Sequence, residues 1–127
     1  MNAKHVIVAD DEKEMRHFVC WALLRRGYRT TEVTSGEEAL SKCSDPLNAV
    51  DALVTDYDMP GISGLEVVEE LRSRGITIPA IVMSRNDEED LPRKLELLNN
   101  TAFIRKPFVP DSLVELMESQ FHCAVIA

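Results

Sequence analysis

Short apolar runs alternate with helical patterns along the chain, and this alternation limits the folds that it can adopt. The runs are rich in Val, Ile, Leu and Ala and are bounded by polar residues, which is typical of strands buried on both faces. They cover residues 5–9, 51–55, 80–84 and 102–104. Amphipathic patterns typical of helices occupy residues 12–26, 35–44, 63–74, 90–99 and 110–121.

A further strand is predicted at residues 29–34, RTTEVT, which is polar at most positions. Such a strand belongs at the edge of a sheet, where one side meets water. Right-handed crossovers between parallel strands place helices on both faces of the sheet. The sequence therefore predicts an α/β fold, a flavodoxin-like doubly wound (βα)5 arrangement with a five-stranded parallel sheet in the order 2-1-3-4-5.

The length and charge of the chain limit the number of domains and the kinds of partner that it can have. Its 127 residues, 45% of them hydrophobic, predict a single domain over residues 1–127 with a short tail at 122–127. A net charge of -8 without a basic cluster argues against direct binding of nucleic acid. No apolar stretch has the length of a membrane span or the form of a signal peptide, so we expect a cytoplasmic protein without membrane contact.

Three cysteines, Cys20, Cys43 and Cys123, lie at wide and irregular spacing. An odd number at such spacing fits neither a disulfide framework nor a zinc site. We expect free thiols in a reducing compartment.

Polar side chains stand at the ends of the predicted strands. Asp10 and Asp11 follow the first strand, Asp56 follows the third, and Ser84 and Lys106 end the fourth and fifth. In doubly wound sheets, ligands lie beyond the carboxyl ends of the strands at the topological switch point, here between the first and third strands. Each residue alone has a plainer interpretation, such as a helix cap or an Asx turn. Their convergence on one edge predicts a functional site.

The chemistry of this edge indicates a metal ion. Three neighbouring carboxylates repel one another unless a cation joins them. Mg²⁺ is the expected cofactor, because it prefers oxygen ligands and retains several waters. We expect Asp11 and Asp56 to bind it directly, the backbone carbonyl of Asp58 to complete the protein ligands, and Asp10 to act through water.

One oxygen of Asp56 then remains available as a nucleophile. Aspartyl carboxylates attack phosphorus to form acyl phosphates. We therefore expect Asp56 to accept a phosphoryl group, with Lys106 and the Ser84 hydroxyl holding its remaining oxygens.

Four segments in this order resemble the receiver domains of two-component response regulators: VADDEKEMR, VTDYDMPGISGLEVVEELR, AIVMSR and FIRKPF. The resemblance implies that Asp56 receives its phosphoryl group from the phosphohistidine of a sensor histidine kinase or a histidine phosphotransferase. It implies a regulatory phosphoacceptor with Mg²⁺-dependent self-phosphorylation and autodephosphorylation, not an enzyme acting on other substrates. It also makes Ser84 the phosphoryl sensor, places Phe103 at the aromatic switch position, and implies a cis peptide bond before Pro107.

Two departures from the family pattern concern the fourth strand and helix. Arg85 stands where the family mostly has a small residue, so its side chain is expected to flank the pocket mouth with Asp58, to pair with it, and to slow the entry of small donors and water. The alternative is an arginine that points into solvent. Pro92 predicts a late helix start with Asp90 as the cap. The predicted buried stripe of this helix is Leu91, Leu95 and Leu98.

The first predicted helix carries an unusual outer face. At 100° per residue, the arc that faces the sheet holds Met15, Val19, Ala22 and Leu23. The opposite arc holds His17, Cys20, Trp21 and Leu24. An apolar outer face predicts a partner surface. The family resemblance favours a kinase or phosphotransferase as the partner, and a phosphorylation-dependent homodimer is the alternative.

Two other functions share parts of this pattern. Asp56, Tyr57 and Asp58 form the D-x-D spacing of haloacid-dehalogenase-like phosphatases, but those enzymes carry it after their first strand. A flavodoxin-like flavin-binding protein needs a Ser-, Thr- or Gly-rich phosphate loop after the first strand, where this chain has the acidic ADDEKE. The output partner or domain is not indicated by the sequence.

Overall fold

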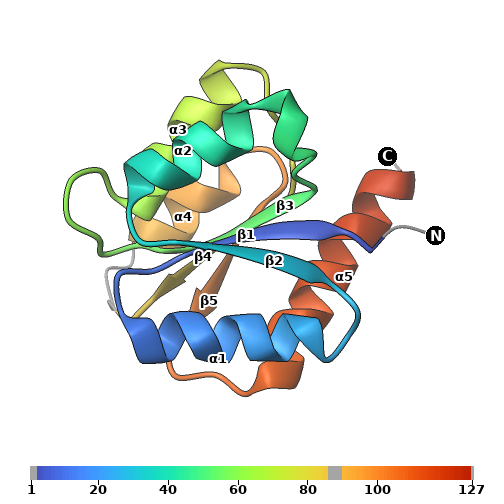
Figure 1. Cartoon of the computed structure of the whole chain (residues 1–127). Helices are drawn as coiled ribbons and strands as arrows, with labels where there is room; N and C mark the ends of the chain where they lie inside the picture. The colour runs from blue at the N-terminus through green and yellow to red at the C-terminus, as the bar shows by residue number, and fades with distance from the viewer. Residues whose placement is uncertain (1–2, 86–89, 127) are drawn as a thin grey trace.

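The computed structural model describes residues 3–85 and 90–126, with side chains described as far as residue 122. A central sheet lies between two layers of helices (Figure 1). The strands are β1 (His5–Ala9), β2 (Arg29–Val33), β3 (Ala52–Asp56), β4 (Ala80–Ser84) and β5 (Thr101–Arg105). The helices are α1 (Lys13–Leu24), α2 (Gly36–Ser44), the 3-10 helix η1 (Pro46–Asn48), α3 (Gly64–Ser73), α4 (Asp90–Glu96) and α5 (Pro110–Ile126).

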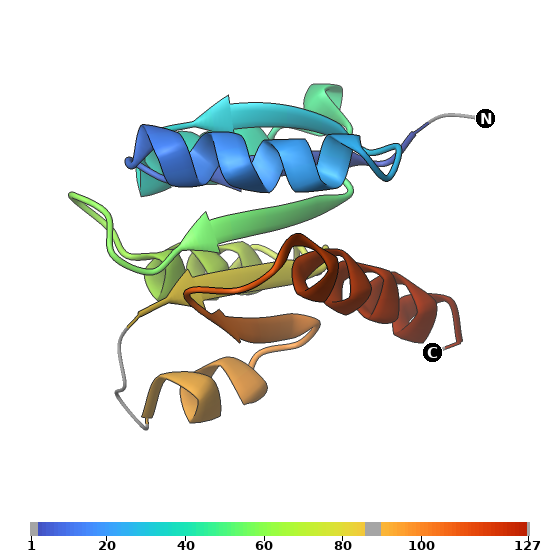
Figure 2. The same cartoon turned by 90° about the horizontal axis from the view of Figure 1, so that it is seen from below.

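The sheet is parallel and runs β2-β1-β3-β4-β5, which confirms the predicted order and fold class. Helices α1 and α5 cover one face, and α2, α3 and α4 cover the other (Figures 1 and 2). β2 is the polar edge strand, as predicted. The start of β1 and the last described turn of α5 lie at the edge opposite the carboxyl ends of the strands (Figure 2).

The continuous apolar runs are explained by burial on both faces of the sheet. Every residue of β1, β3 and β4 is buried. Ile7 and Leu53 pack into the core on the side of α2, α3 and α4, whereas Val6 and Val54 pack into the core under α1 and α5. A strand with two apolar faces shows no period-two alternation, and this is the pattern that the sequence displays.

The ends of several elements differ from the prediction. β3 runs one residue further, through Asp56, and α4 ends at Glu96, three residues early. Leu98 therefore lies beyond the helix, although it still packs against the core, and Asn100 turns the chain with a positive φ of 52°. The chain at 122–126, predicted as a tail, continues α5, because its apolar residues contain no helix breaker. Leu91 and Leu95 are buried as predicted.

Further sequence predictions concern the cap of α4, the cysteines and the membrane. Asp90 is the first residue of α4, not the cap before it. Cys20 and Cys43 are buried free thiols, as predicted, and the Cys123 side chain lies outside the described residues. In the described part of the chain, no helix is long and apolar enough to cross a membrane. The cytoplasmic location stays a prediction.

Arg72 of α3 joins the turns at the amino ends of β4 and β5. Its guanidinium donates at 2.7 Å to each of the backbone carbonyls of Ile76, Ile78 and Asn99. It also donates at 3.2 Å to the carbonyl of Asn100 and the hydroxyl of Thr101. Burial lowers the pKa of this guanidinium. One side chain therefore supplies donors to several carbonyls of the turns that lead into β4 and β5.

Arg72→Lys should lower the free energy of unfolding by about 2 kcal/mol, because an ammonium cannot reproduce the planar fork that serves several carbonyls. Arg74→Lys is the matched control. Arg74 is an exposed neighbour whose ion pair with Glu70 measures 3.0 Å, and its replacement should cost less than about 0.5 kcal/mol. Urea denaturation followed by circular dichroism measures both, and equal losses in the two variants would contradict the role given to Arg72.

Candidate functional site

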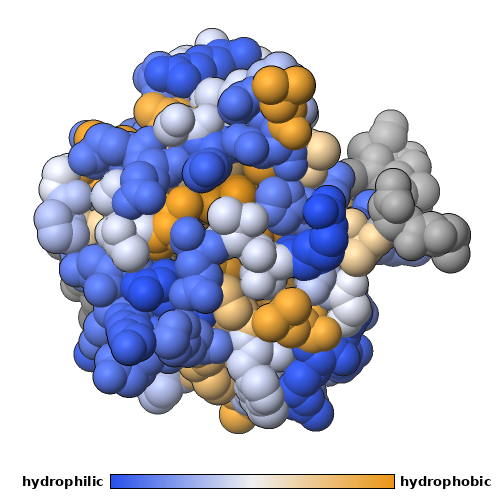
Figure 3. Space-filling model, in the orientation of Figure 1, coloured by the Kyte–Doolittle hydropathy of each residue, from blue (hydrophilic) through white to orange (hydrophobic). Residues whose placement is uncertain are grey.

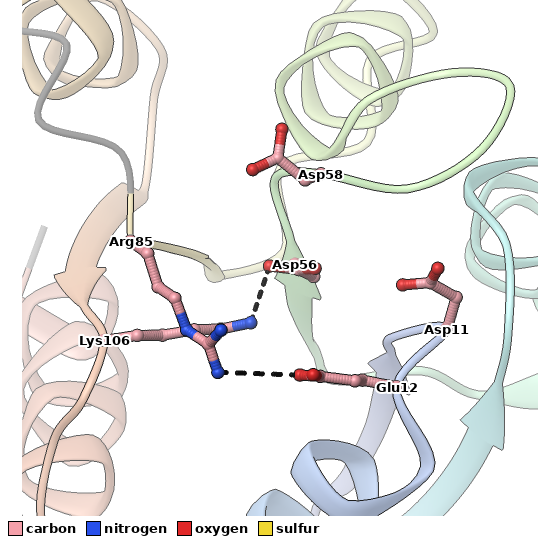
Figure 4. Close-up of a pocket in the computed structure, with 6 residues that line it drawn as sticks. All are labelled: Asp11, Glu12, Asp56, Asp58, Arg85 and Lys106. Carbon is pink, nitrogen blue, oxygen red and sulfur yellow. Dashed lines mark hydrogen bonds and ion pairs between the residues drawn. The ribbon is translucent and has the colours of Figure 1, made fainter.

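Three charged side chains from distant parts of the chain meet at the carboxyl edge of the sheet. Asp10 follows β1, Asp56 is the last residue of β3, and Lys106 follows β5. All three are buried, and Asp10 is fully so. Figure 4 shows the side chain of Lys106 reaching across the pocket toward Asp56. The sequence prediction that these residues converge is confirmed by this geometry.

The Lys106 ammonium lies between two buried carboxylates. Its Nζ donates to Oδ1 of Asp56 at 2.8 Å and lies 3.6 Å from Oδ2 of Asp10. Oδ1 of Asp10 accepts the backbone N–H of Glu12 at 2.9 Å. Oδ2 of Asp10 is buried without a hydrogen bond among the described residues. One ammonium thus faces two acids, and Oδ2 of Asp10 has an ion pair with it but no hydrogen bond among the described residues.

Burial raises the pKa of both acids. For Asp10 the rise is opposed chiefly by the Glu12 N–H, and for Asp56 by the hydrogen bond from Lys106. The Coulomb repulsion of Asp10 raises the pKa of Asp56 further. The ionised site is therefore costly to maintain in the apo protein, and a bound cation would remove that cost.

Asp11 completes an acidic cluster on the exposed side of these two residues. Asp10, Asp11 and Asp56 each offer one carboxylate oxygen, and these oxygens lie within 4.8 Å of one another. Asp11 and Asp56 open on a cavity of about 240 Å³. Its lining is formed by Asp11, Glu12, Asp56, Asp58, Arg85 and Lys106 (Figure 4). Clustered oxygens, one of them without a donor, are the ligands that a hard divalent cation such as Mg²⁺ prefers.

A tight loop after β3 brings Asp58 to the rim of this cavity. Gly64, the first residue of α3, lies so close to the strand end that a Cβ there would clash with the Asp56 carbonyl oxygen. Its N–H donates to the Tyr57 carbonyl at 3.0 Å, and Ser63 caps the helix in a reciprocal pair with Glu66. Only glycine permits this approach, so the loop folds back and leaves Asp58 exposed at the rim.

Ser84 and Phe103 occupy the two neighbouring strands. Ser84 is buried at the end of β4, and its carbonyl accepts the Lys106 N–H at 2.9 Å. Phe103 of β5 is half-buried against the core on the α4 side. It lines a cavity of about 380 Å³ with Pro92 and Leu95 of α4. The peptide bond between Lys106 and Pro107 is cis, as the family resemblance implied.

The predicted ion pair of Arg85 with Asp58 is corrected by the structure. The Arg85 guanidinium pairs instead with Glu12, at 3.8 Å between Nη2 and Oε1. It extends across the cavity alongside Lys106, toward the start of α1 (Figure 4). Glu12 was missed as a site residue, and its position directly after Asp10 and Asp11 was the available signal.

The predicted face of α1 is confirmed in part. Val19, Ala22 and Leu23 are buried, and Met15 packs against the core. Of the predicted outer face, His17, Trp21 and Leu24 are exposed.

The prediction that Cys20 lies on the outer face of α1 was wrong. Cys20 is buried, since it lies on the flank of α1 next to β2 and its thiol hydrogen-bonds with Thr30. Trp21 is covered on one side by the guanidinium of Arg25, 4.5 Å from a ring centroid. Figure 3 shows a small apolar spot over the carboxyl end of α1, one of several apolar areas on this face.

An acidic cavity with a buried lysine lies at the switch point of a doubly wound sheet, where such sheets bind their ligands. The chain belongs to the response regulator receiver domains, because the model of that family matches residues 6–118. It is 31% identical over 115 residues to the phosphate regulon transcriptional regulatory protein PhoB of Escherichia coli, covering 88% of this chain and 49% of PhoB.

Two further matches are also to response regulators. Response regulator SaeR of Staphylococcus aureus is 31% identical over 110 residues, covering 87% of this chain and 47% of SaeR. The solved receiver domain of the Francisella response regulator 1452 is 28% identical, with a TM-score of 0.84 over 95% of this chain and 98% of that chain. The chain spans about half the length of the curated relatives it matches. Neither the phosphatase nor the flavin-binding alternative is favoured by these matches.

Asp10→Asn should stabilise the metal-free protein at neutral pH. The folded-state pKa of Asp10 is raised, so its ionised form costs stability above that pKa, and the cost disappears as the pH falls toward the lower pKa of the unfolded chain. The variant should gain about 1 kcal/mol or more at pH 7, and less at about pH 5. Urea denaturation in the presence of a chelator at the two pH values measures this gain.

Asp11→Asn is the control, because Asp11 is exposed and its replacement should change stability by less than about 0.5 kcal/mol. A loss of stability in Asp10→Asn at pH 7 would show that the Asp10 carboxylate stabilises the fold.

Proposed function

We propose that this receiver domain accepts a phosphoryl group onto Asp56 from the phosphohistidine of a sensor histidine kinase or a histidine phosphotransferase. The observation that carries the proposal is the position of Asp56. It ends β3 in the acidic cavity, and Lys106 holds its Oδ1 at 2.8 Å. A buried carboxylate with one oxygen fixed by an ammonium presents its other oxygen in a defined direction, which in-line phosphoryl transfer requires.

The residues that would hold Mg²⁺ are Asp11 and Asp56 directly, Asp58 through its backbone carbonyl, and Asp10 through water. The clustered carboxylate oxygens support this assignment, and so does Oδ2 of Asp10, which has no hydrogen bond among the described residues. When bound, Mg²⁺ would neutralise the acids and stabilise negative charge on the phosphoryl oxygens.

The transfer forms one bond and breaks another. An oxygen of the Asp56 carboxylate attacks phosphorus, and the P–N bond to the donor imidazole breaks with its electron pair going to the nitrogen. The product is an acyl phosphate on Asp56. The Lys106 ammonium moves from the carboxylate toward the phosphoryl oxygens, which carry more charge. Self-phosphorylation by small donors and autodephosphorylation follow the same geometry, with water as the nucleophile in the second case.

The phosphoryl group then changes the conformation through Ser84 and Phe103. The Ser84 hydroxyl donates to a phosphoryl oxygen, and its displacement leaves space beside β5 that Phe103 fills. Phe103 is only partly buried and borders a cavity with Pro92 and Leu95, so α4 does not enclose its ring. Phe103 has no hydroxyl, so packing alone stabilises the inward position. Phosphorylation thereby shifts an equilibrium between two arrangements of α4 and β5.

The partners that read this change are also part of the proposal. The exposed residues His17, Trp21 and Leu24 of α1 would form part of the surface that docks the kinase or phosphotransferase, with homodimerisation as the alternative. The switch would control a partner protein or an attached output domain.

Asp56→Asn should abolish an acid-labile, hydroxylamine-sensitive adduct of about 80 Da, the mass added by one phosphoryl group. The measurement is intact-mass spectrometry after incubation with acetyl phosphate and Mg²⁺. Asp58→Asn is the matched control, because it keeps the backbone carbonyl and should keep the adduct. An undiminished adduct in Asp56→Asn would refute the assignment of the acceptor.

Beryllofluoride with Mg²⁺ should shift the NMR signals of Phe103 and its neighbours in α4 and β5, because it mimics the phosphoryl group. In Ser84→Ala the shift at Phe103 should be smaller, while the signals next to Asp56 still respond. Unchanged Phe103 signals in the wild-type protein, under conditions where the signals next to Asp56 move, would contradict the switch.

A further inference from the structure

A cation other than Lys106 lies across the mouth of the phosphorylation cavity. The Arg85 side chain is 71% exposed and reaches Glu12 at 3.8 Å, whereas that of Lys106 is 6% exposed and lies between Asp56 and Asp10. Both side chains enter the cavity from the β4 and β5 side and point toward α1 (Figure 4). Lys106 is therefore held by two carboxylates inside the cavity, whereas the exposed Arg85 guanidinium is held by its pair with Glu12.

The bridge to Glu12 is weak enough to exchange. Both partners are largely exposed, and exposed ion pairs contribute little because water and salt screen them. A phosphoryl group on Asp56 brings about 1.5 to 2 negative charges and three acceptor oxygens into the same cavity. A guanidinium binds a phosphate with two parallel hydrogen bonds, and a stronger acceptor in reach displaces the carboxylate.

We propose that Arg85 is a second phosphoryl-binding cation, and that Glu12 competes for it and holds it at the opposite lip until Asp56 is phosphorylated. This inference rests on the proposed function of Asp56. Binding by Arg85 prolongs the phosphorylated state, because the guanidinium both neutralises charge and covers the approach of water in line with the P–O bond. Glu12 shortens the lifetime of the phosphorylated state, because a guanidinium that is paired with Glu12 does not bind the phosphoryl group.

Arg85 and Glu12 therefore have opposite effects on the lifetime of the phosphorylated state. This distinguishes the proposal from a purely steric closure of the cavity by the two side chains. If Arg85 and Glu12 only closed the mouth together, removing either would open it, and both variants would lose the phosphoryl group faster. Under competition, Arg85→Ala speeds the loss and Glu12→Gln slows it. The expected changes are roughly two- to fivefold in each direction.

The decisive experiment measures beryllofluoride affinity in the presence of Mg²⁺ and the rate of autodephosphorylation, for wild type, Arg85→Ala, Glu12→Gln and the double variant. Arg85→Ala should bind beryllofluoride more weakly and Glu12→Gln more tightly, with the double variant equal to Arg85→Ala because Glu12 acts only through Arg85. Arg85→Lys should fall between Arg85→Ala and wild type. The control Arg93→Ala removes an equal charge on α4 and should leave both values unchanged.

Changes of the same sign in Arg85→Ala and Glu12→Gln, or no change in either, would overturn the competition. A double variant in which Glu12→Gln still acts would overturn it as well. Failure of the wild type to bind beryllofluoride or to form an adduct would instead refute the proposed function, so the two failures are distinguishable. All these substitutions lie on the surface, and circular dichroism confirms that each variant is folded.

Discussion

The site depends on one ammonium held between two buried carboxylates. Lys106 reaches Asp56 across 50 residues of sequence and lies 3.6 Å from Asp10, and burial raises the pKa of both acids. Such a group of buried charges lowers the stability of the metal-free protein. A bound cation or a phosphoryl group changes the net charge of the cavity. The parallel sheet makes the arrangement possible, because its strands end at one edge and deliver the three residues there.

Most of the fold could be predicted from the hydrophobic pattern of the sequence alone. Runs without alternation predicted strands buried on both faces, and the polar run at 29–34 placed β2 at the edge, from which the strand order followed. The ends of α4 and α5 could not be predicted in this way. The end of α4 depends on a turn at Asn100, and the apolar residues after 121 are as compatible with a helix as with a tail. The interactions of Arg72 bridge segments that no local pattern connects.

The site was predictable where it depends on strand ends and unpredictable where it depends on side-chain direction. Asp10, Asp56 and Lys106 had to meet because parallel strands share an edge. Arg85 could have turned toward Asp58 or Glu12, and only the direction of its side chain across the cavity decides for Glu12. Cys20 was misplaced for a similar reason, since a helical arc does not include the neighbouring strand β2 that covers its flank.

The central claim is that Asp56, and none of the neighbouring acids, forms the acyl phosphate. Borohydride reduces an acyl phosphate to an alcohol and leaves free carboxylates unchanged, so it marks the acceptor in the wild-type protein. Peptide mapping after phosphorylation and reduction should find the modified residue at position 56 alone. A modified residue at position 10, 11 or 58 would contradict the account, because it would show that the geometry around Lys106 does not select the nucleophile.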